Sequence, residues 1–454
     1  MNDRPFRNFF KINTSYWLLV VPILYTTVPW VNYRMRGLVP SFAALLWLLP
    51  KISKIMAKFN CREGRAFFAA IFWFLILMFL REIFAIIGSQ EHMQYHHVAT
   101  ICMQLCYFLV AFYTIVYRKF NELRFLTIVT LGGFILGGIC SLRGLGVEGL
   151  ESGRATVTIQ NAGHMVSAEA IDNTIATFSL GLGGYSYAYY CAWMIGVALL
   201  AIGITKNMQL RLLYCAALIG CVFSVKVCGL GTPVAIVALE FALFVLWFVT
   251  RSRKLVAILA GILIFLYFIY SSTPTIFSPF AGFLEAVAEN MSPGGIKERV
   301  VSVAEAFRGD ASYANIRVQL QMKSWQTFFE HPFLGTFGPF ARGSQMDLGG
   351  HSYVLDILGG YGLLGLFCLT MFVCLTLRYF KMLGLIYFGT KWLIMPLFFM
   401  LVFILSGIMN PVTFLAISVY LLPGLAYLSL DSQKQHILEF GTGSQYMHPV
   451  YCYV

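Results

Sequence analysis

The chain has 454 residues, of which 59% are hydrophobic and only 11% are charged, and its formal net charge is +12. A soluble globular protein is about 45–50% apolar and about 25% charged, so this chain has too few polar side chains to cover a water-exposed surface. The composition also excludes intrinsic disorder, a collagen helix and a coiled coil. We therefore expect an all-α polytopic membrane protein.

Apolar segments long enough to cross a bilayer recur along the chain. A helix crosses the ~30 Å hydrocarbon core in about 20 residues, which predicts about twelve spans, give or take one. Tyr33 and Arg34 follow the first span in place of a small-residue cleavage site, so we expect no cleavable signal peptide. The predicted spans are 16–32, 37–50, 66–88, 98–117, 125–140, 185–205, 212–228, 233–250, 255–272, 352–377, 392–409 and 412–430, and 379–391 could extend the eleventh.

The basic residues predict how these spans are oriented. Positive residues in short loops mark the cytoplasmic side of a membrane. If the spans alternate, 20 of the 32 lysines and arginines fall on one side, in 1–15, 51–65, 118–124, 206–211, 251–254, 378–391 and the tail after 430. We therefore expect a multi-pass protein of the cytoplasmic (inner) membrane with both termini in the cytoplasm. This loop pattern reports orientation, and it does not indicate binding to nucleic acid.

The predicted organisation has four regions. Residues 1–272 hold nine spans and the outer loop 141–184, 273–351 form a large extracytoplasmic helical loop, 352–430 hold three spans, and 431–454 form a cytoplasmic tail. Hydrophobic residues recur at helical spacing in the large loop, which is typical of interfacial helices lying on a membrane. We expect a further helix there from about Tyr313 to Glu330.

Two groups of residues flank the start of the tenth span. The first is Arg317, Trp325, Phe328, Phe329 and the string His331-Pro332-Phe333-Leu334-Gly335-Thr336-Phe337-Gly338-Pro339-Phe340. The second is Gly350-His351-Ser352-Tyr353, followed by Gly359 and Gly362-Leu363-Leu364-Gly365. Together they resemble the signature of the O-antigen ligase and polysaccharide polymerase superfamily, which includes Wzy-type polymerases and WaaL-type ligases. The detailed match covers about 310–366.

This resemblance implies a GT-C-like fold and sugar transfer from an undecaprenyl-pyrophosphate donor on the outer leaflet, without a metal or other cofactor. It implies His351 as the catalytic base and Arg317 on the pyrophosphate. The further residues expected to bind substrate are Arg143, Arg154, Arg342, Lys226, Trp325, Ser352 and Tyr353. The expected partners are the lipid-linked oligosaccharide, membrane lipid, a chain-length regulator and a flippase.

The sequence departs from the family pattern at two places. The asparagine that usually follows the histidine is Ser352 here. A short outer turn that often reads Ser-Arg is 229–233 (Gly-Leu-Gly-Thr-Pro) in this chain and has no arginine. Lys226, one turn inside the preceding helix, is the nearest cation, so one anion-binding position of the family has no direct counterpart.

Several polar residues allow a structural and a functional interpretation. Lys226 and Glu240 flank one hairpin at similar depth, so a salt bridge between them is geometrically possible, and a structural pair is as acceptable as a substrate contact. Asp356 could orient the site around His351 or simply line a wet cavity. His92 and His96 could chelate a metal if their segment were helical, although a polar outer turn is the simpler interpretation.

The residues leave three functions open. A polysaccharide polymerase and an O-antigen ligase would share this site and differ in the acceptor. A lipid-linked oligosaccharide flippase belongs to another class, and it needs charged residues along a cavity through the membrane. Transporters built from inverted repeats also have interrupted helices in both halves, which the sequence does not reveal. The few buried charges and the large outer loop favour catalysis over transport.

Overall fold

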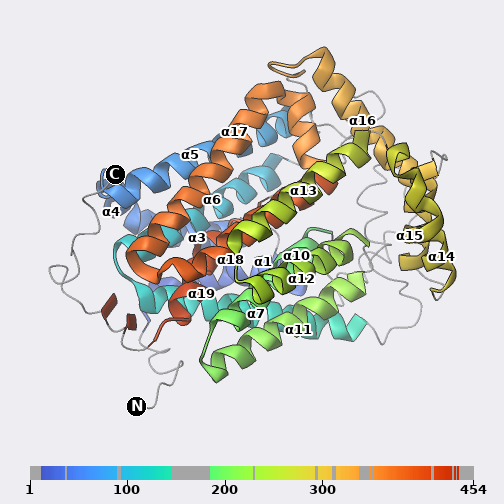
Figure 1. Cartoon of the computed structure of the whole chain (residues 1–454). Helices are drawn as coiled ribbons and strands as arrows, with labels where there is room; N and C mark the ends of the chain where they lie inside the picture. Colours follow the sequence, from blue (N-terminus) through green and yellow to red (C-terminus); the bar gives the residue numbers. More distant parts are fainter. Residues whose placement is uncertain are drawn as a thin grey trace.

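The computed structural model describes residues 12–35, 38–88, 94–144, 185–228, 231–272, 274–291, 295–308, 313–336, 348, 352–410, 414–431, 434, 435, 437 and 438. These residues form helices and no β strand, which confirms the predicted all-α class (Figure 1). By length and composition, seven of their helical segments could cross a membrane: Leu38–Ala57, Phe120–Leu142, Tyr187–Ile204, Met208–Cys228, Thr232–Thr250, Tyr353–Phe388 and Thr390–Met409. The chain is thus a helical membrane protein, while the count of twelve stays a prediction.

The first part of the chain builds most of the bundle. Its helices are α1 (Val20–Thr27), α2 (Pro29–Met35), α3 (Leu38–Leu48), α4 (Ile52–Ala57), α5 (Arg62–Gly88), α6 (Gln94–Val116), α7 (Phe120–Gly144), α10 (Tyr185–Ile204), α11 (Met208–Cys228), α12 (Gly231–Thr250) and α13 (Arg253–Ser272). The 3-10 turns η2 (Thr14–Leu19) and η3 (Leu49–Lys51) adjoin α1 and α3. Because α3, η3 and α4 are continuous to Ala57, the second predicted span is long enough to cross a membrane.

The remaining helices either lie at one end of the bundle or return through it and complete it. Residues beyond α13 form η5 (Pro274–Phe280), α14 (Ala281–Glu289), α15 (Gly295–Arg308) and α16 (Tyr313–Glu330), which lie together at the end of the bundle opposite α4 (Figure 1). The helix expected at 313–330 is thereby confirmed. The chain then returns through α17 (Tyr353–Leu383), η6 (Gly384–Phe388), η7 (Thr390–Leu393), α18 (Ile394–Met409) and α19 (Ser418–Leu428).

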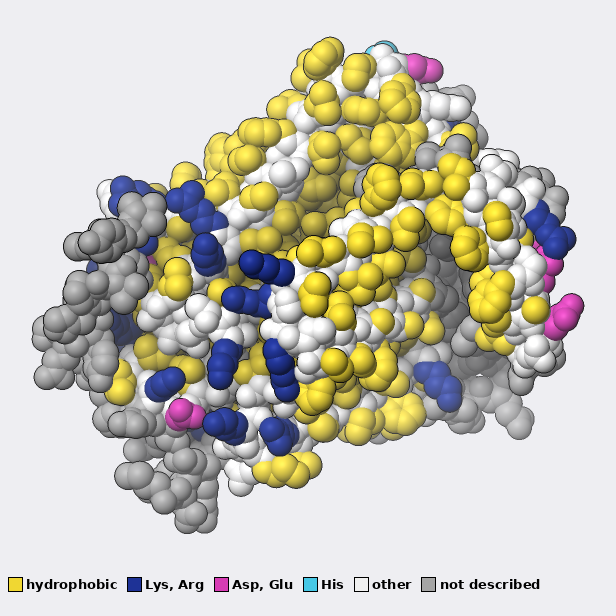
Figure 2. All heavy atoms as spheres, viewed as in Figure 1, with side chains coloured by type: hydrophobic (Ala, Val, Ile, Leu, Met, Phe, Trp, Pro, Cys, Tyr) yellow, Lys and Arg dark blue, Asp and Glu magenta, His cyan; other side chains and the backbone are white. Residues whose placement is uncertain are grey.

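Charged side chains divide between the two ends of the bundle. On the face shown in Figure 2, Lys and Arg gather mostly toward the α4 end, and acidic side chains appear among basic ones over α14 and α15. Arg308 of α15 forms a surface ion pair with Glu285 of α14. The broad apolar surface between these ends suits lipid contact, and the charge division fits the positive-inside pattern. Which end faces the cytoplasm remains a prediction.

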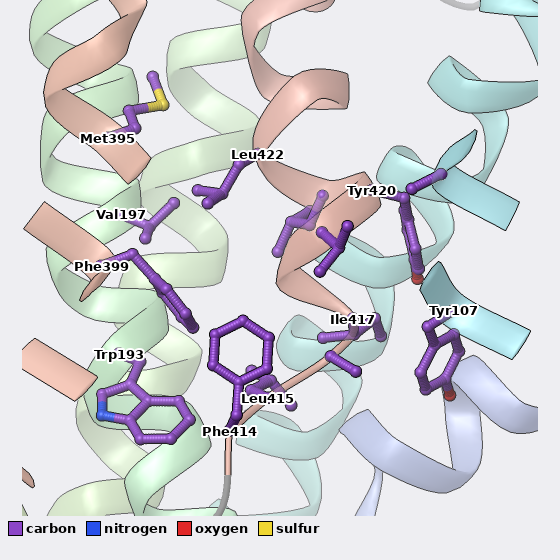
Figure 3. Close-up of a cluster of buried hydrophobic side chains, with 14 of the residues drawn as sticks. Tyr107, Trp193, Val197, Met395, Phe399, Phe414, Leu415, Ile417, Tyr420 and Leu422 are labelled. Atoms are coloured by element: carbon purple, nitrogen blue, oxygen red, sulfur yellow. The ribbon is translucent and has the colours of Figure 1, made fainter. Parts of the chain in front are cut away.

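Aromatic packing holds the centre of the bundle together. Phe414, in the non-helical stretch before α19, points into a cluster of buried side chains (Figure 3). Its ring centroid lies 5.1 Å from that of Phe372, 5.3 Å from Phe403 and 5.6 Å from Phe399, each pair being edge-on. These rings belong to α17 and α18, so one loop side chain ties both helices to the core.

The first and the twelfth predicted spans are interrupted. The first, 16–32, breaks at Val28, because the ring of Pro29 disfavours helical backbone at the residue before it. In the twelfth, 412–430, the described residues 414–417 are not helical, and the helix covers Ser418–Leu428. Buried non-helical backbone in a membrane protein needs internal hydrogen-bond partners, and the side chain of Gln104 accepts a bond of 3.1 Å from the amide of Ala416.

Candidate functional site

The tenth predicted span contains a break that the sequence did not reveal. Gly362 has φ 60° and ψ −150° in the middle of α17, a backbone conformation that glycine adopts far more easily than other residues. At ~1.5 Å per residue, 363–383 suffice to cross the ~30 Å hydrocarbon core. The segment 353–361 is therefore a separate short helix, and the helix after the break is by itself long enough to cross.

The turn that follows α16 fills this break. A broken helix leaves backbone N–H groups without their usual carbonyl partners. The amide of Leu363 donates to the carbonyl of Pro332 at 2.8 Å, and that of Leu364 donates to the carbonyl of Phe333 at 3.2 Å. In the other direction, the amide of Thr336 donates to the carbonyl of Gly359 at 3.3 Å. The turn thus replaces the missing part of the helical ladder.

Two glycines allow these backbones to touch. A Cβ atom at Gly362 would lie 2.5 Å from the carbonyl carbon of Phe333, and one at Gly335 would overlap the backbone of Gly360. Gly335 also has a positive φ of 64°. The structure therefore brings together described members of both motif groups, namely the turn at 331–336 and the glycines of α17.

Helix α16 is joined to α17 through Asp356. The hydroxyl of Ser324 donates to Oδ1 of Asp356 at 2.7 Å, and the amide of Ser352 donates to Oδ2 at 3.2 Å. Asp356 is only 3% exposed, and both serines are 1% exposed. Its two oxygens accept one bond from each side, so this buried contact connects α16 to the start of α17.

The contact between α16 and α17 around Asp356 is also hydrogen-bonded to two further helices. The amide of Tyr353 donates to the carbonyl of Asn410 at the end of α18, at 3.2 Å. On the other side, the side chain of Gln321 donates to the hydroxyl of Tyr267 on α13 at 3.2 Å. The start of α17 and the middle of α16 therefore lie beside the ends of α13 and α18. We call this meeting point of the four helices the junction.

Three of the predicted site residues lie at this junction. Ser352 caps α17, because its hydroxyl accepts a bond from the amide of Leu355 at 3.2 Å. Serine and asparagine are both strong helix N-caps, so serine can fill this position as well as asparagine can. Tyr353 is the first residue of α17, and Trp325 on α16 stacks on Phe329 with ring centroids 5.8 Å apart.

Lys226 lies elsewhere. It belongs to the end of α11, which packs against α7 and α10, and its side chain is exposed. Glu240 on α12 is fully buried, and neither carboxylate oxygen has a hydrogen-bond partner among the described residues. The ion pair considered between them is therefore absent, because the two side chains point into different surroundings.

The other predicted site residues fall outside the described part of the chain. His351, Arg154 and Arg342 do so entirely. The backbones of Arg143 in α7 and Arg317 in α16 are described, and only their side chains fall outside the described part. His92 also falls outside it, as does the side chain of His96. Within the described residues, no group of three or more His, Cys, Asp or Glu is placed to hold a metal ion.

Sequence reasoning missed part of the junction. Ser324 and Asn410 carried no signal, because a serine in an amphipathic helix and an asparagine after a span are ordinary residues. Asp356 could be noticed as a charge within an apolar segment. Its hydrogen-bond partner 32 residues earlier could not be inferred from spacing.

No protein-family model matches the chain, and no curated protein is significantly similar to it in sequence. The resemblance to the O-antigen ligase and polysaccharide polymerase superfamily therefore rests on the residues of 310–366 alone.

Proposed function

We propose that this protein is a membrane glycosyltransferase that polymerises oligosaccharide repeat units carried on undecaprenyl pyrophosphate, such as those of O antigen, capsule or exopolysaccharide. One observation carries the proposal: the turn at 331–336 and the glycines of α17, which are separate in the sequence, form one hydrogen-bonded unit. Residues that recur together in a family because they act together are expected to meet in this way. The site would face the outer side of the cytoplasmic membrane.

In the proposed reaction, an acceptor hydroxyl attacks the anomeric carbon of the donor sugar and forms the new glycosidic bond. His351 takes the proton of that hydroxyl, since imidazole ordinarily titrates near neutral pH. The bond from the same carbon to the pyrophosphate oxygen breaks, and the carrier leaves with the electron pair. A single displacement of this kind inverts the configuration at the anomeric carbon.

The leaving pyrophosphate carries several negative charges, which guanidinium groups stabilise by paired, charge-assisted hydrogen bonds. Arg317 is proposed for this role, with Arg143, Arg154 and Arg342 as further contacts. Lys226 is the weakest of these candidates, because α11 does not belong to the junction of α13, α16, α17 and α18. Trp325, Ser352 and Tyr353 are proposed to contact the sugar.

The test is a transfer assay with purified protein in lipid nanodiscs and a synthetic undecaprenyl-pyrophosphate-linked repeat unit. We expect dimers and longer products from the wild type and none from His351→Ala. Arg317→Lys should also lose most activity, because an ammonium group does not reproduce the planar fork of a guanidinium. Arg308→Lys is the matched control for Arg317→Lys, because the native side chain of Arg308 is exposed on the described surface.

Normal product ladders from His351→Ala would refute the catalytic assignment. Transfer only to a lipid A-core acceptor would identify the O-antigen ligase, which is the nearest alternative.

A lipid-linked oligosaccharide flippase is the second candidate from another class. The breaks at Val28 and before Ser418 favour it, because transporters often bind substrate at interrupted helices in both halves of the chain. Movement of a fluorescent lipid-linked oligosaccharide across a proteoliposome membrane, without any new glycosidic bond, would support this function and exclude the first.

A further inference from the structure

Two carboxylates are buried among the described residues, and their surroundings differ. Glu240 lies among apolar helices, and its oxygens have no hydrogen-bond partner in the described part of the chain. Asp356 instead uses its two oxygens separately: Oδ1 accepts from Ser324 on α16, and Oδ2 accepts from the amide of Ser352. A single side chain thereby fixes one helix and the first turn of another.

Packing alone already brings α16 and α17 into contact. A Cβ atom at Gly359 would lie 2.9 Å from the carbonyl oxygen of Ser324, so the helices approach closely beside Asp356. A buried charged group costs desolvation, and apolar residues of similar volume often pack as stably in its place. In some proteins, buried polar contacts of this kind select one particular arrangement. The position of Asp356 therefore suggests a requirement for geometry in addition to stability.

The arrangement that Asp356 fixes includes residues proposed for catalysis. Trp325 directly follows Ser324, and Tyr353 directly follows Ser352. Ser352 is also the residue bonded to His351 in the chain. A shift of α16 along α17 would change the separation between the helix that carries Arg317 and Trp325 and the residues at the start of α17.

We propose that Asp356 is a positioning residue, which holds α16 and the start of α17 in the one relative placement that sugar transfer requires. This inference rests on the proposed function. Asp356 itself contacts neither sugar nor pyrophosphate in the proposal, and it acts through Ser324 and Ser352. Because a misplacement of about 1 Å can reduce a rate by about 100-fold, the effect should appear in turnover more than in substrate affinity.

The experiment compares Asp356→Asn, Ser324→Ala and the double variant with the wild type in the transfer assay. Asn keeps the size of Asp but replaces one acceptor oxygen by a donor. We expect kcat to fall about 100-fold in Asp356→Asn and about 10-fold in Ser324→Ala, with KM for the donor within about twofold. The double variant should be no slower than Asp356→Asn alone, because both changes disrupt the same link between α16 and the start of α17.

Glu240→Gln is the matched control, since it converts the other buried carboxyl group into an amide of the same size that keeps one acceptor oxygen. It should keep the wild-type kcat. Hydrogen exchange followed by mass spectrometry gives a readout independent of activity. In Asp356→Asn, exchange should rise in peptides covering 313–336 and 352–361 and stay unchanged in α7.

The outcomes separate the two proposals. If the wild type transfers sugar and Asp356→Asn keeps its kcat, or if its exchange at 313–336 is unchanged, the positioning role is refuted while the proposed function stands. The positioning role is also refuted if kcat falls as much in Glu240→Gln as in Asp356→Asn. If the wild type itself transfers no sugar from the lipid-linked donor, the proposed function fails, and the positioning role fails with it.

Discussion

The centre of the bundle and the α16–α17 junction are held together in different ways. Around Phe414 the contacts are between large apolar rings from several helices. At the junction, two glycines bring backbones together, and hydrogen bonds connect the turn 331–336, Ser324 and Asp356. Ring packing tolerates changes that conserve volume, whereas a contact between backbones tolerates no added atom. We therefore expect the two regions to respond differently to substitution.

The largest expected effect is at the centre of the bundle. Phe414→Ala should lower the free energy of unfolding by about 3 kcal/mol, because it leaves a cavity between the rings of α17 and α18. This value is at the low end for buried aromatic residues, since side chains of a membrane protein remain in apolar surroundings when helices separate. Thermal unfolding in detergent measures it. Phe414→Leu, which keeps most of the volume, should cost less than half as much, and equal losses would refute the packing argument.

Gly362→Ala should break the junction at a cost of about 2 kcal/mol. A residue other than glycine pays about 1–3 kcal/mol for a backbone with φ 60° and ψ −150°, and the new methyl group also meets the carbonyl carbon of Phe333. Gly261→Ala in α13 is the control, because nothing lies within 4 Å of its Cβ position. It should unfold at the wild-type temperature or slightly above. If both variants melt alike, the close approach at Gly362 does not matter for stability.

Gln104→Leu tests the hydrogen bond between Gln104 and Ala416, a polar contact within the apolar centre of the bundle. Without the side-chain carbonyl, the buried amide of Ala416 loses its acceptor, and an unsatisfied buried donor costs about 1–3 kcal/mol. We expect a destabilisation of about 1 kcal/mol in the same unfolding assay, and faster hydrogen exchange in peptides spanning 414–420. Protection equal to that of the wild type would show that another acceptor serves this amide.

The smallest effect is expected at Glu240, and its direction is opposite. Glu240→Met should leave stability unchanged or raise it by up to about 1 kcal/mol. Its carboxyl oxygens have no hydrogen-bond partner among the residues that the structure describes, and replacing such a buried polar group with an apolar one is often neutral or stabilising. Asp356→Leu is the contrast, since it removes the acceptor of two hydrogen bonds and should lower the melting temperature. A clear loss of stability in Glu240→Met would indicate a partner for this carboxyl.

Much of the fold could be predicted from the sequence, because it depends on local patterns. The helix at Tyr313–Glu330 begins and ends at the predicted residues, and α10 (Tyr185–Ile204) does so to within one residue. The break at Gly362 could not be predicted from hydropathy, because the apolar pattern continues through it. The late start of α19 depends on a side chain of α6, more than 300 residues away in the chain.

For the candidate site, too, the residue types could be predicted from the sequence, and the contacts between distant residues could not. Its motif residues and Asp356 stand out in the sequence by type and by order. Their contact depends on the turn after α16 reaching into α17, and only the folded chain brings Pro332 to Leu363. For Lys226, similar depth suggested a pair with Glu240, but depth does not determine the direction in which each helix face points.

The break in α17 also ties the start of the long helix 363–383 to the turn that follows α16. An uninterrupted helix adapts to a thicker or thinner bilayer by tilting or by shifting its ends. The crossing part of α17 cannot easily shift at Leu363, because the carbonyls of Pro332 and Phe333 hold its first two amides. Hydrophobic mismatch at this helix should therefore be transmitted to α16, so lipids of different acyl-chain length would act on the junction before they act on the rest of the bundle.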